Sequence, residues 1–205
     1  LEHGLCHLGF ALENIHFPKD MEAANIARRR LIFEELLVLQ LALQRMKGRN
    51  RRQRGPLFST DYTEEFCSHL PFSPTGAQKR VIAECAADMD SGLCMNRLVQ
   101  GDVGSGKTAV AAALCFTAAK NGFQAAMMAP TEILAKQHYA TFSSFLEGTG
   151  VTIALLTGST PAAQKRTVLT GLRDGSIQLA VGTHALLSEG VECSKLGLVI
   201  TDEEH

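Results

Sequence analysis

Apolar positions divide the chain into a helical N-terminal stretch and a longer region in which strand and helix patterns alternate. Residues 23–46 contain no Gly or Pro, and their apolar side chains recur at helical spacing. That pattern predicts one long, well-buried helix. Residues 8–16 are compatible with a short helix that stops at Phe17-Pro18. We therefore expect an α-helical connector ahead of the main fold.

Short apolar segments follow one another between residues 98 and 200, and helical patterns separate them. The expected strands are residues 98–100, 125–128, 151–156, 177–181 and 196–200. The expected helices are residues 61–69, a helix ending near 120, and residues 131–145 and 161–172. Short apolar strands separated by helices are typical of a parallel sheet that is covered on both faces. The pattern therefore predicts an α/β fold.

Residues 47–56 lie between these two regions and are polar, basic and bounded by turn residues, which predicts a loop or linker. The formal net charge of the chain is −1, so a nucleic-acid surface would have to come from local clustering. Residues 28–54 provide such a cluster, with nine basic side chains against two acidic ones. The basic run is equally compatible with a solvated connector and with contacts to phosphate groups.

The composition limits the class of protein. Apolar residues make up 45% of the chain and charged residues 20%, which is near the average of soluble globular proteins and argues against extensive disorder. No apolar run approaches the length that is needed to cross a bilayer. The six cysteines are scattered without a C-x-x-C pair, which favours reduced thiols in a cytoplasmic protein. Because the chain begins at Leu1 without a Met, we expect it to be a piece of a longer protein.

A glycine-rich motif follows the first expected strand and opens the next expected helix. It reads Gly101-Asp102-Val103-Gly104-Ser105-Gly106-Lys107-Thr108 and matches the P-loop pattern G-x-x-x-x-G-K-[ST]. Its glycines let successive N–H groups face phosphates, and the N-terminus of the helix favours their negative charge. We expect Lys107 to reach the β- and γ-phosphates of a nucleotide and Thr108 to ligate Mg²⁺.

An acidic cluster directly follows the last expected strand, where a P-loop protein needs a carboxylate for the metal. The cluster is Asp202-Glu203-Glu204-His205. Asp202 is expected to bind Mg²⁺, directly or through water, and Glu203 to polarise the attacking water. The sequence therefore predicts a catalytic set of Lys107, Asp202 and Glu203 around a nucleoside triphosphate and Mg²⁺. The geometric condition is that both segments converge on one magnesium–triphosphate.

The acidic cluster has the form of the D-E-x-H box of superfamily 2 helicases, whereas N-K-x-D and L-S-G-G-Q motifs are absent from the sequence. Other stretches resemble the ordered motifs of these helicases. They are residues 70–78 (the Q motif), 129–132 (motif Ia), 156–158 (motif Ib) and 182–184 (motif Ic). The resemblance implies an incomplete RecA-like lobe of a P-loop NTPase with a parallel sheet, and it implies that the nucleotide is ATP.

The match narrows further to the RecG family of bacterial branch-migrating DNA helicases, which the chain resembles over nearly its whole length. The runs that carry this resemblance are G-D-V-G-S-G-K-T, A-P-T-E-I-L-A-K-Q-H, V-G-T-H-A-L-L, the I-H-F-P segment at residues 15–18 and the helical run at 30–37. Transcription-repair coupling translocases share G-D-V-G-x-G-K-T and G-T-H and are the nearest alternative. The I-H-F-P segment and the long helix favour RecG, although Glu204 stands where RecG proteins commonly have Gln.

The resemblance also implies roles for further residues, each of which has a structural alternative. Gln78 would contact adenine and Phe72 would stack on the base, although Thr75 and Gln78 also fit an ordinary helix capping box. The implied DNA-phosphate contacts come from Pro130, Thr131, Thr157, Gly158 and Thr183, which could equally be ordinary helix starts and turns. His205 would link the γ-phosphate to the DNA-binding elements. We assign no chemistry to His138 or His184.

In the helicases that the chain resembles, a further strand lies between the P-loop strand and the strand that ends in the acidic box. A second RecA-like lobe then supplies an arginine that stabilises the transition state. We therefore expect the 205 residues to be a fragment with an open slot in its sheet, and to hydrolyse ATP negligibly alone. The expected divisions are residues 1–20 as the tail of an upstream wedge-type DNA-binding domain, 21–58 as long helix and basic linker, and 59–205 as the truncated lobe.

The implied function is the ATP-binding part of a DNA helicase or translocase that remodels replication forks and Holliday junctions in repair and recombination. Its partners would be branched or duplex DNA and the missing domains of the parent chain, with no membrane and a monomeric state. Two alternatives remain at this point. One is a transcription-repair coupling translocase, and the other is a non-enzymatic module that uses ATP as a switch.

Overall fold

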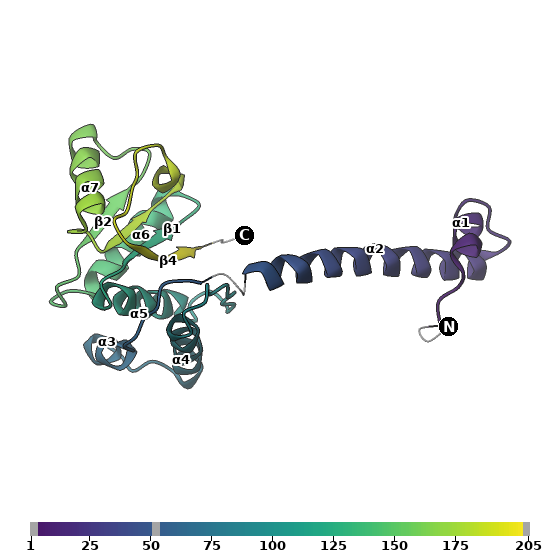
Figure 1. Cartoon of the computed structure of the whole chain (residues 1–205), viewed down its shortest axis with the longest axis horizontal. Coiled ribbons are helices and arrows are strands. Elements are labelled where there is room, and N and C mark those ends of the chain that lie inside the picture. The colour runs from purple at the N-terminus through teal and green to yellow at the C-terminus, as the bar shows by residue number, and fades with distance from the viewer. Residues whose placement is uncertain (1–3, 51–53, 203–205) are drawn as a thin grey trace. The chain divides into compact units, whose positions relative to one another are not determined.

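The computed structural model describes residues 4–50 and 54–202, without the side chains of residues 46–50. It divides into two compact units, Leu1–Arg52 and Gln53–His205 (Figure 1). The first unit is helical and the second is α/β, as the sequence predicts. Among the described helices, none combines the length and the apolar character that a membrane span requires.

The first unit consists of α1 (Leu8–His16) and α2 (Met21–Asn50), which lie against each other. Ala11, Ala23 and Ala27 are buried between them, because small side chains let two helices approach closely. At the start of α2, Oδ1 of Asp20 accepts a hydrogen bond from the backbone N–H of Ala23 at 2.7 Å. This bond satisfies one of the N–H groups that a helix N-terminus leaves without a partner.

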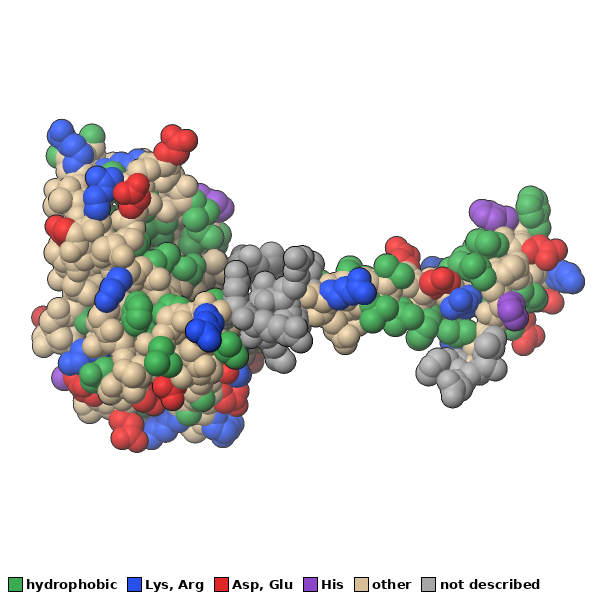
Figure 2. Space-filling model, in the orientation of Figure 1, with side chains coloured by type: hydrophobic (Ala, Val, Ile, Leu, Met, Phe, Trp, Pro, Cys, Tyr) green, Lys and Arg blue, Asp and Glu red, His purple; other side chains and the backbone are tan. Residues whose placement is uncertain are grey.

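Two expectations for this unit are wrong. The helix does not stop near residue 46 but continues to Asn50, so the first part of the predicted basic loop is helical. Lys47 and Arg49 are good helix formers, and a glycine such as Gly48 costs a helix only about 1 kcal/mol. The helix is also not well buried, because α1 is short and Leu36, Val38 and other apolar side chains between residues 32 and 43 are exposed (Figure 2).

The second unit is built on a parallel four-stranded sheet, as predicted. Its strands are β1 (Gln124–Met128), β2 (Ile153–Leu156), β3 (Leu179–Gly182) and β4 (Leu196–Thr201), in the spatial order β2-β3-β1-β4. Because all strands run the same way, the residues that follow them lie at one edge of the sheet. That edge, which we call the carboxyl edge, carries most of the residues singled out from the sequence.

Helices cover both faces of this sheet. On one face α5 (Lys107–Lys120) and α6 (Glu132–Phe145) pack on β1 and β3, and α3 (Thr63–His69) and α4 (Gly76–Asp90) pack against α5 (Figure 1). On the other face lie α7 (Ala162–Asp174) and the short 3-10 helix η1 (His184–Leu187). Phe116 and Phe142 are fully buried in the larger core, on the first face.

The strand expected at residues 98–100 does not form. Residues 94–100 have no regular secondary structure and make no ladder with any described strand, and Leu98 is 88% exposed. A cavity of about 480 Å³ lies between this segment and β4, with Val99 and Ile200 among its lining residues. The segment therefore lacks, among the described residues, the neighbour that a strand needs.

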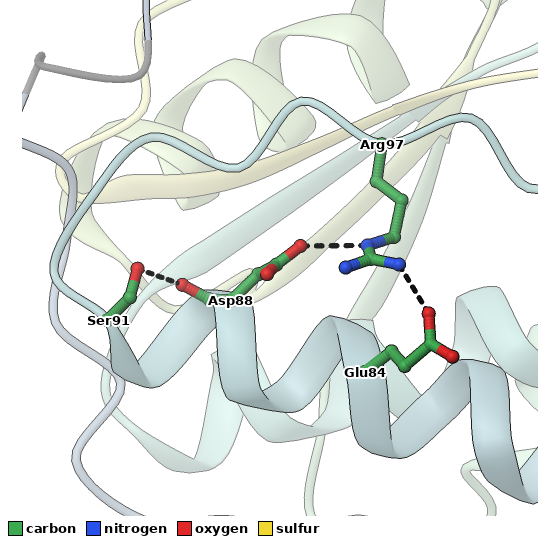
Figure 3. Close-up of polar contacts among 4 residues, drawn as sticks. All are labelled: Glu84, Asp88, Ser91 and Arg97. Carbon is green, nitrogen blue, oxygen red and sulfur yellow. Dashed lines mark hydrogen bonds and ion pairs between the residues drawn. The ribbon is translucent and has the colours of Figure 1, made fainter.

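An ion-pair cluster holds this segment against α4 instead. The guanidinium of Arg97 donates from Nε to Oδ2 of Asp88 at 2.8 Å and from Nη1 to Oε2 of Glu84 at 2.5 Å (Figure 3). The Ser91 hydroxyl donates to the backbone carbonyl of Asp88 at the end of the same helix. The hydrogen bond to Asp88 raises the pKa of Arg97 further above its ordinary value, so the guanidinium stays charged.

Candidate nucleotide-binding site

The P-loop opens α5 as the sequence predicts, although residues 94–100 before it do not form the expected strand. Gly104 and Gly106 both have φ of +80°, a left-handed conformation that other residues rarely adopt, and Gly106 is the N-cap of α5. The ammonium of Lys107 folds back over the loop and donates to the carbonyls of Gly101 at 2.7 Å and Asp102 at 3.1 Å. The loop therefore places a cation and a helix N-terminus side by side, which suits a polyphosphate.

The acidic strand end meets this loop. Lys107 and Thr108 from the start of α5, and Asp202 from the end of β4, line the same cavity of about 480 Å³, a volume typical of small-ligand sites. The convergence that the motor hypothesis requires is therefore present for Asp202. Glu203, Glu204 and His205, the remaining residues of the acidic box, lie outside the described residues.

Asp202 is held in place by two neighbouring elements. Its backbone N–H donates to the carbonyl of Met128 in β1 at 2.8 Å. Its Oδ2 lies 2.7 Å from Nε2 of His138 in α6, and both side chains are largely buried, with 20% and 13% exposed. His138, to which we assigned no chemistry from the sequence, is in contact with the expected metal ligand.

A sequence signal for His138 exists in hindsight. Ala135 and Phe142, at positions −3 and +4 from it, are fully buried, so His138 lies on the face of α6 that packs inward. A polar side chain on such a face needs a buried partner. The pattern predicts that a partner exists, but it cannot name one that is 64 residues away.

Gln78 forms the helix capping box that was the structural alternative to a contact with adenine, and it also contacts the P-loop. Its Oε1 accepts from the backbone N–H of Thr75 at 2.8 Å, and its own N–H donates to the Thr75 hydroxyl oxygen, so a complete capping box opens α4. Its Nε2 donates to the carbonyl of Ser105 at 2.8 Å. Gln78 thus lies beside the nucleotide loop, and its proposed contact with adenine remains a prediction.

Phe72 does not line the cavity. Its ring contacts Phe145, at the end of α6, in an edge-to-face arrangement with 5.9 Å between the ring centroids. The side chain is 44% exposed, and Phe72 is not among the residues that line the cavity beside Lys107. Stacking of Phe72 on a base therefore also remains a prediction, and it would require a surface that Phe145 does not cover.

The residues expected to contact DNA all follow strands at the carboxyl edge. Pro130 and Thr131 follow β1 and are exposed, and Gly158 follows β2 and is exposed. Thr183 follows β3, is half-buried and caps η1, whereas Thr157 is only 3% exposed. The Thr157 hydroxyl lies within hydrogen-bonding distance of Ser159 and Thr160, so this side chain shapes its own turn. All five residues therefore lie at the carboxyl edge, and their contacts with DNA remain a prediction.

Glu132 connects two of these turns. Its carboxylate accepts from the backbone N–H of Ser159 at 2.9 Å and from the Ser159 hydroxyl at 2.6 Å, which joins the start of α6 to the turn after β2. These hydrogen bonds lower the pKa of Glu132 below its ordinary value, and the bond from the Ser159 hydroxyl has the largest effect. The contact is long-range and was not expected from the sequence.

The donor set fits a magnesium-bound nucleoside triphosphate. Lys107, the left-handed glycines and the N-terminus of α5 favour the phosphates, while hydroxyl and carboxylate oxygens of Thr108 and Asp202 are ligands that Mg²⁺ prefers. The φ of +80° at Gly106 favours glycine there, and a Cβ at this position would also displace the end of the Gln78 side chain. Both arguments come from the residues themselves and agree with the motif.

Comparison with known proteins places the chain in a family. Residues 75–205 match the model of the DEAD/DEAH box helicases. The chain is 44% identical to the ATP-dependent DNA helicase RecG of Synechocystis sp. over all of its length and 46% identical to that of Bacillus subtilis over 95% of it. It spans 25% and 29% of the length of these two curated relatives.

Solved structures agree with this result. A structure of RecG bound to a three-way DNA junction aligns with the whole chain at a TM-score of 0.85 and 44% identity, and the chain covers 28% of it. A hypothetical ATP-dependent RNA helicase from Sulfolobus tokodaii aligns with 70% of the chain, and the chain covers 41% of it, at a TM-score of 0.51 and 23% identity, which supports the fold alone. The second unit is thus part of a RecA-like P-loop lobe. The chain belongs to the DEAD/DEAH box helicase family, and within that family its whole length is similar to RecG.

Proposed function

We propose that this chain is the ATP-binding part of an ATP-dependent DNA helicase that remodels replication forks and Holliday junctions in repair and recombination. The observation that carries the proposal is the convergence of Lys107, Thr108 and Asp202 on one cavity at the carboxyl edge of the sheet. The similarity to RecG, including a structure of RecG bound to a three-way junction, supports branched DNA as the substrate class.

Each residue of the cavity would have a defined task. Lys107 would exchange its loop carbonyls for the β- and γ-phosphates, and the N-terminal N–H groups of α5 would donate to phosphate oxygens. Thr108 and Asp202 would hold Mg²⁺, which neutralises charge on the phosphates during transfer. Glu203, the next residue of the acidic box, would polarise the attacking water.

The exposed turns of the carboxyl edge would bind the DNA backbone. Small residues such as Gly158 and the N-terminus of α6 at Thr131 let backbone N–H groups approach phosphate oxygens without reading the bases. Binding of this kind is independent of sequence and weakens as the salt concentration rises. It suits a motor that must move along any duplex.

The rest of the parent protein would supply the remaining helicase domains. The chain spans about a quarter of its curated relatives, so a second RecA-like lobe with its transition-state arginine and an upstream wedge domain would come from outside these residues. We infer that the parent acts as a monomer in the cytoplasm, where its DNA lies.

The test is the ATP turnover of the full-length parent with and without a three-way DNA junction. We expect the junction to stimulate turnover strongly, and linear duplex DNA of the same length to stimulate it less. Negligible turnover under both conditions would favour an ATP switch without enzymatic activity. Stimulation by RNA polymerase instead of the junction would favour a transcription-repair coupling translocase.

A further inference from the structure

The contact between His138 and Asp202 connects two parts of the site that the sequence treats separately. Nε2 of the imidazole lies 2.7 Å from Oδ2 of the carboxylate, and the two residues come from α6 and from the end of β4. An ionised carboxylate only accepts hydrogen bonds, so the imidazole must carry a proton on Nε2 and donate it. The bond is well shielded, because only 13% of the His138 side chain is exposed.

The bond leaves the rest of the carboxylate available for a metal. Within residues 4–50 and 54–202, His138 is the side chain that hydrogen-bonds to the Asp202 carboxylate, and it engages Oδ2. Asp202 also lines the cavity with Thr108, the other expected metal ligand. A carboxylate that is held at one oxygen keeps a fixed orientation, and metal ligands held in this way bind their ion more tightly.

The position of His138 also connects the orientation of the Asp202 carboxylate to the carboxyl edge of the sheet. The helix that carries it begins at Glu132 and is capped by Thr131, whose hydroxyl oxygen accepts from the N–H of Leu134 at 3.3 Å. His138 is two turns further on, roughly 10 Å along the axis. Because a helix moves as a stiff rod, a shift of its N-terminus at the carboxyl edge would also move the imidazole.

We propose that His138 is a positioning residue that orients Asp202 for Mg²⁺ and makes metal binding at the nucleotide depend on the placement of α6. The proposal rests on the proposed function, because Asp202 is the metal ligand of that site. It adds a connection between the DNA-facing end of α6 and the metal that neither motif implies alone.

Variants of the full-length parent can separate positioning from a purely structural role. His138→Leu removes the donor, while His138→Gln retains it, because the Gln amide nitrogen lies at the same number of bonds from Cβ as Nε2. His138→Asn offers the same amide one bond short. His69→Leu is the matched control, because His69 is exposed at the end of α3 and is not among the residues that line the cavity.

The first measurement is the affinity for a fluorescent ADP analogue in Mg²⁺ and in EDTA. We expect His138→Leu and His138→Asn to weaken binding in Mg²⁺ by about 10-fold or more, the usual effect of losing a residue that orients a metal ligand. Binding in EDTA should not change, and His138→Gln and the control should behave like wild type. Equal losses in Mg²⁺ and EDTA, or no loss in Mg²⁺, would overturn the proposal. Should His138→Leu fail to fold, the Gln and Asn variants decide it, and equal behaviour of the two overturns it.

The second measurement addresses the connection to α6. The Mg²⁺ concentration for half-maximal ATP turnover is measured with and without a three-way junction. We expect the junction to lower this concentration in the wild type and in His138→Gln, but not in His138→Leu. An identical junction effect in His138→Leu would overturn the connection. If the wild type shows no DNA-stimulated turnover, the proposed function fails, while the ADP measurement still decides the role of His138.

Discussion

The side chains at the two ends of the parallel sheet, the β2-β3 half and the β4 edge, are buried to very different degrees. On the β2-β3 side, which we call the closed side, Leu156, Leu179 and Val181 are fully buried, and α6 and α7 cover the two faces. On the β4 side, Val199 is 58% exposed and Leu196 is 47% exposed, and a cavity separates β4 from residues 94–100. The P-loop and Asp202 belong to this open side. The contrast shows that the residues singled out for nucleotide binding lie at the more exposed end of the sheet.

The largest expected effect is on the open side. Lys107→Ala in the parent should abolish tight ATP binding and reduce turnover by roughly 100-fold or more, because the main cation facing the phosphates is lost. Glu203→Gln should instead preserve ATP binding and block turnover. Nucleotide affinity and single-turnover hydrolysis separate the two variants. Retained turnover in Lys107→Ala would reject the phosphate site, and an equal loss of binding in Glu203→Gln would make that residue structural.

A pair of side-chain truncations to Ala compares the closed and the open side directly. Phe142→Ala empties a fully buried position against the closed core and should destabilise the α/β unit by about 3–5 kcal/mol. Val199→Ala on the exposed face of β4 should cost less than about 0.5 kcal/mol in the isolated chain. Protection of core amides from hydrogen exchange measures both changes. If Val199→Ala costs several kcal/mol in the parent, a further segment covers it there.

A smaller effect is expected at Gln124, a buried polar side chain at the start of β1. Its Nε2 donates to the carbonyls of Leu172 and Ile177, and its Oε1 accepts from the Ser194 hydroxyl and the Lys195 N–H. Gln124→Met keeps the volume but leaves these groups without partners, which should cost about 1–3 kcal/mol. Thermal denaturation of the variant checks this value, and an unchanged melting temperature would mean that water replaces the amide.

The smallest effect is local and concerns residues 94–100. Arg97→Ala removes the ion pairs with Glu84 and Asp88, so amide exchange should accelerate in this segment while nucleotide affinity falls only modestly. Arg173→Ala breaks a comparable exposed ion pair with Glu192 on the closed side and is the control. Equal exchange in residues 94–100 of both variants would show that backbone contacts, rather than Arg97, hold the segment.

Local patterns predicted most of the fold and part of the site. The strands around β1, β2, β3 and β4, the helix starts at Thr75 and Thr131, and the P-loop turn all depend on residues close in sequence. Residues 98–100 have a strand-like sequence but no strand, because a ladder needs a neighbour that these residues do not meet. Hydrogen bonds from His138 to Asp202 and between Glu132 and Ser159 span 64 and 27 positions, so no local pattern could reveal them.

The lysine that folds back onto its own loop has a consequence for how quickly the site can be used. The ammonium of Lys107 has carbonyl partners in Gly101 and Asp102, so the lysine itself helps to hold the turn in its curled shape. An incoming phosphate then exchanges acceptors with the loop instead of having to order a slack chain. At the proposed nucleotide site, binding of a new nucleotide would therefore require little rearrangement of the backbone.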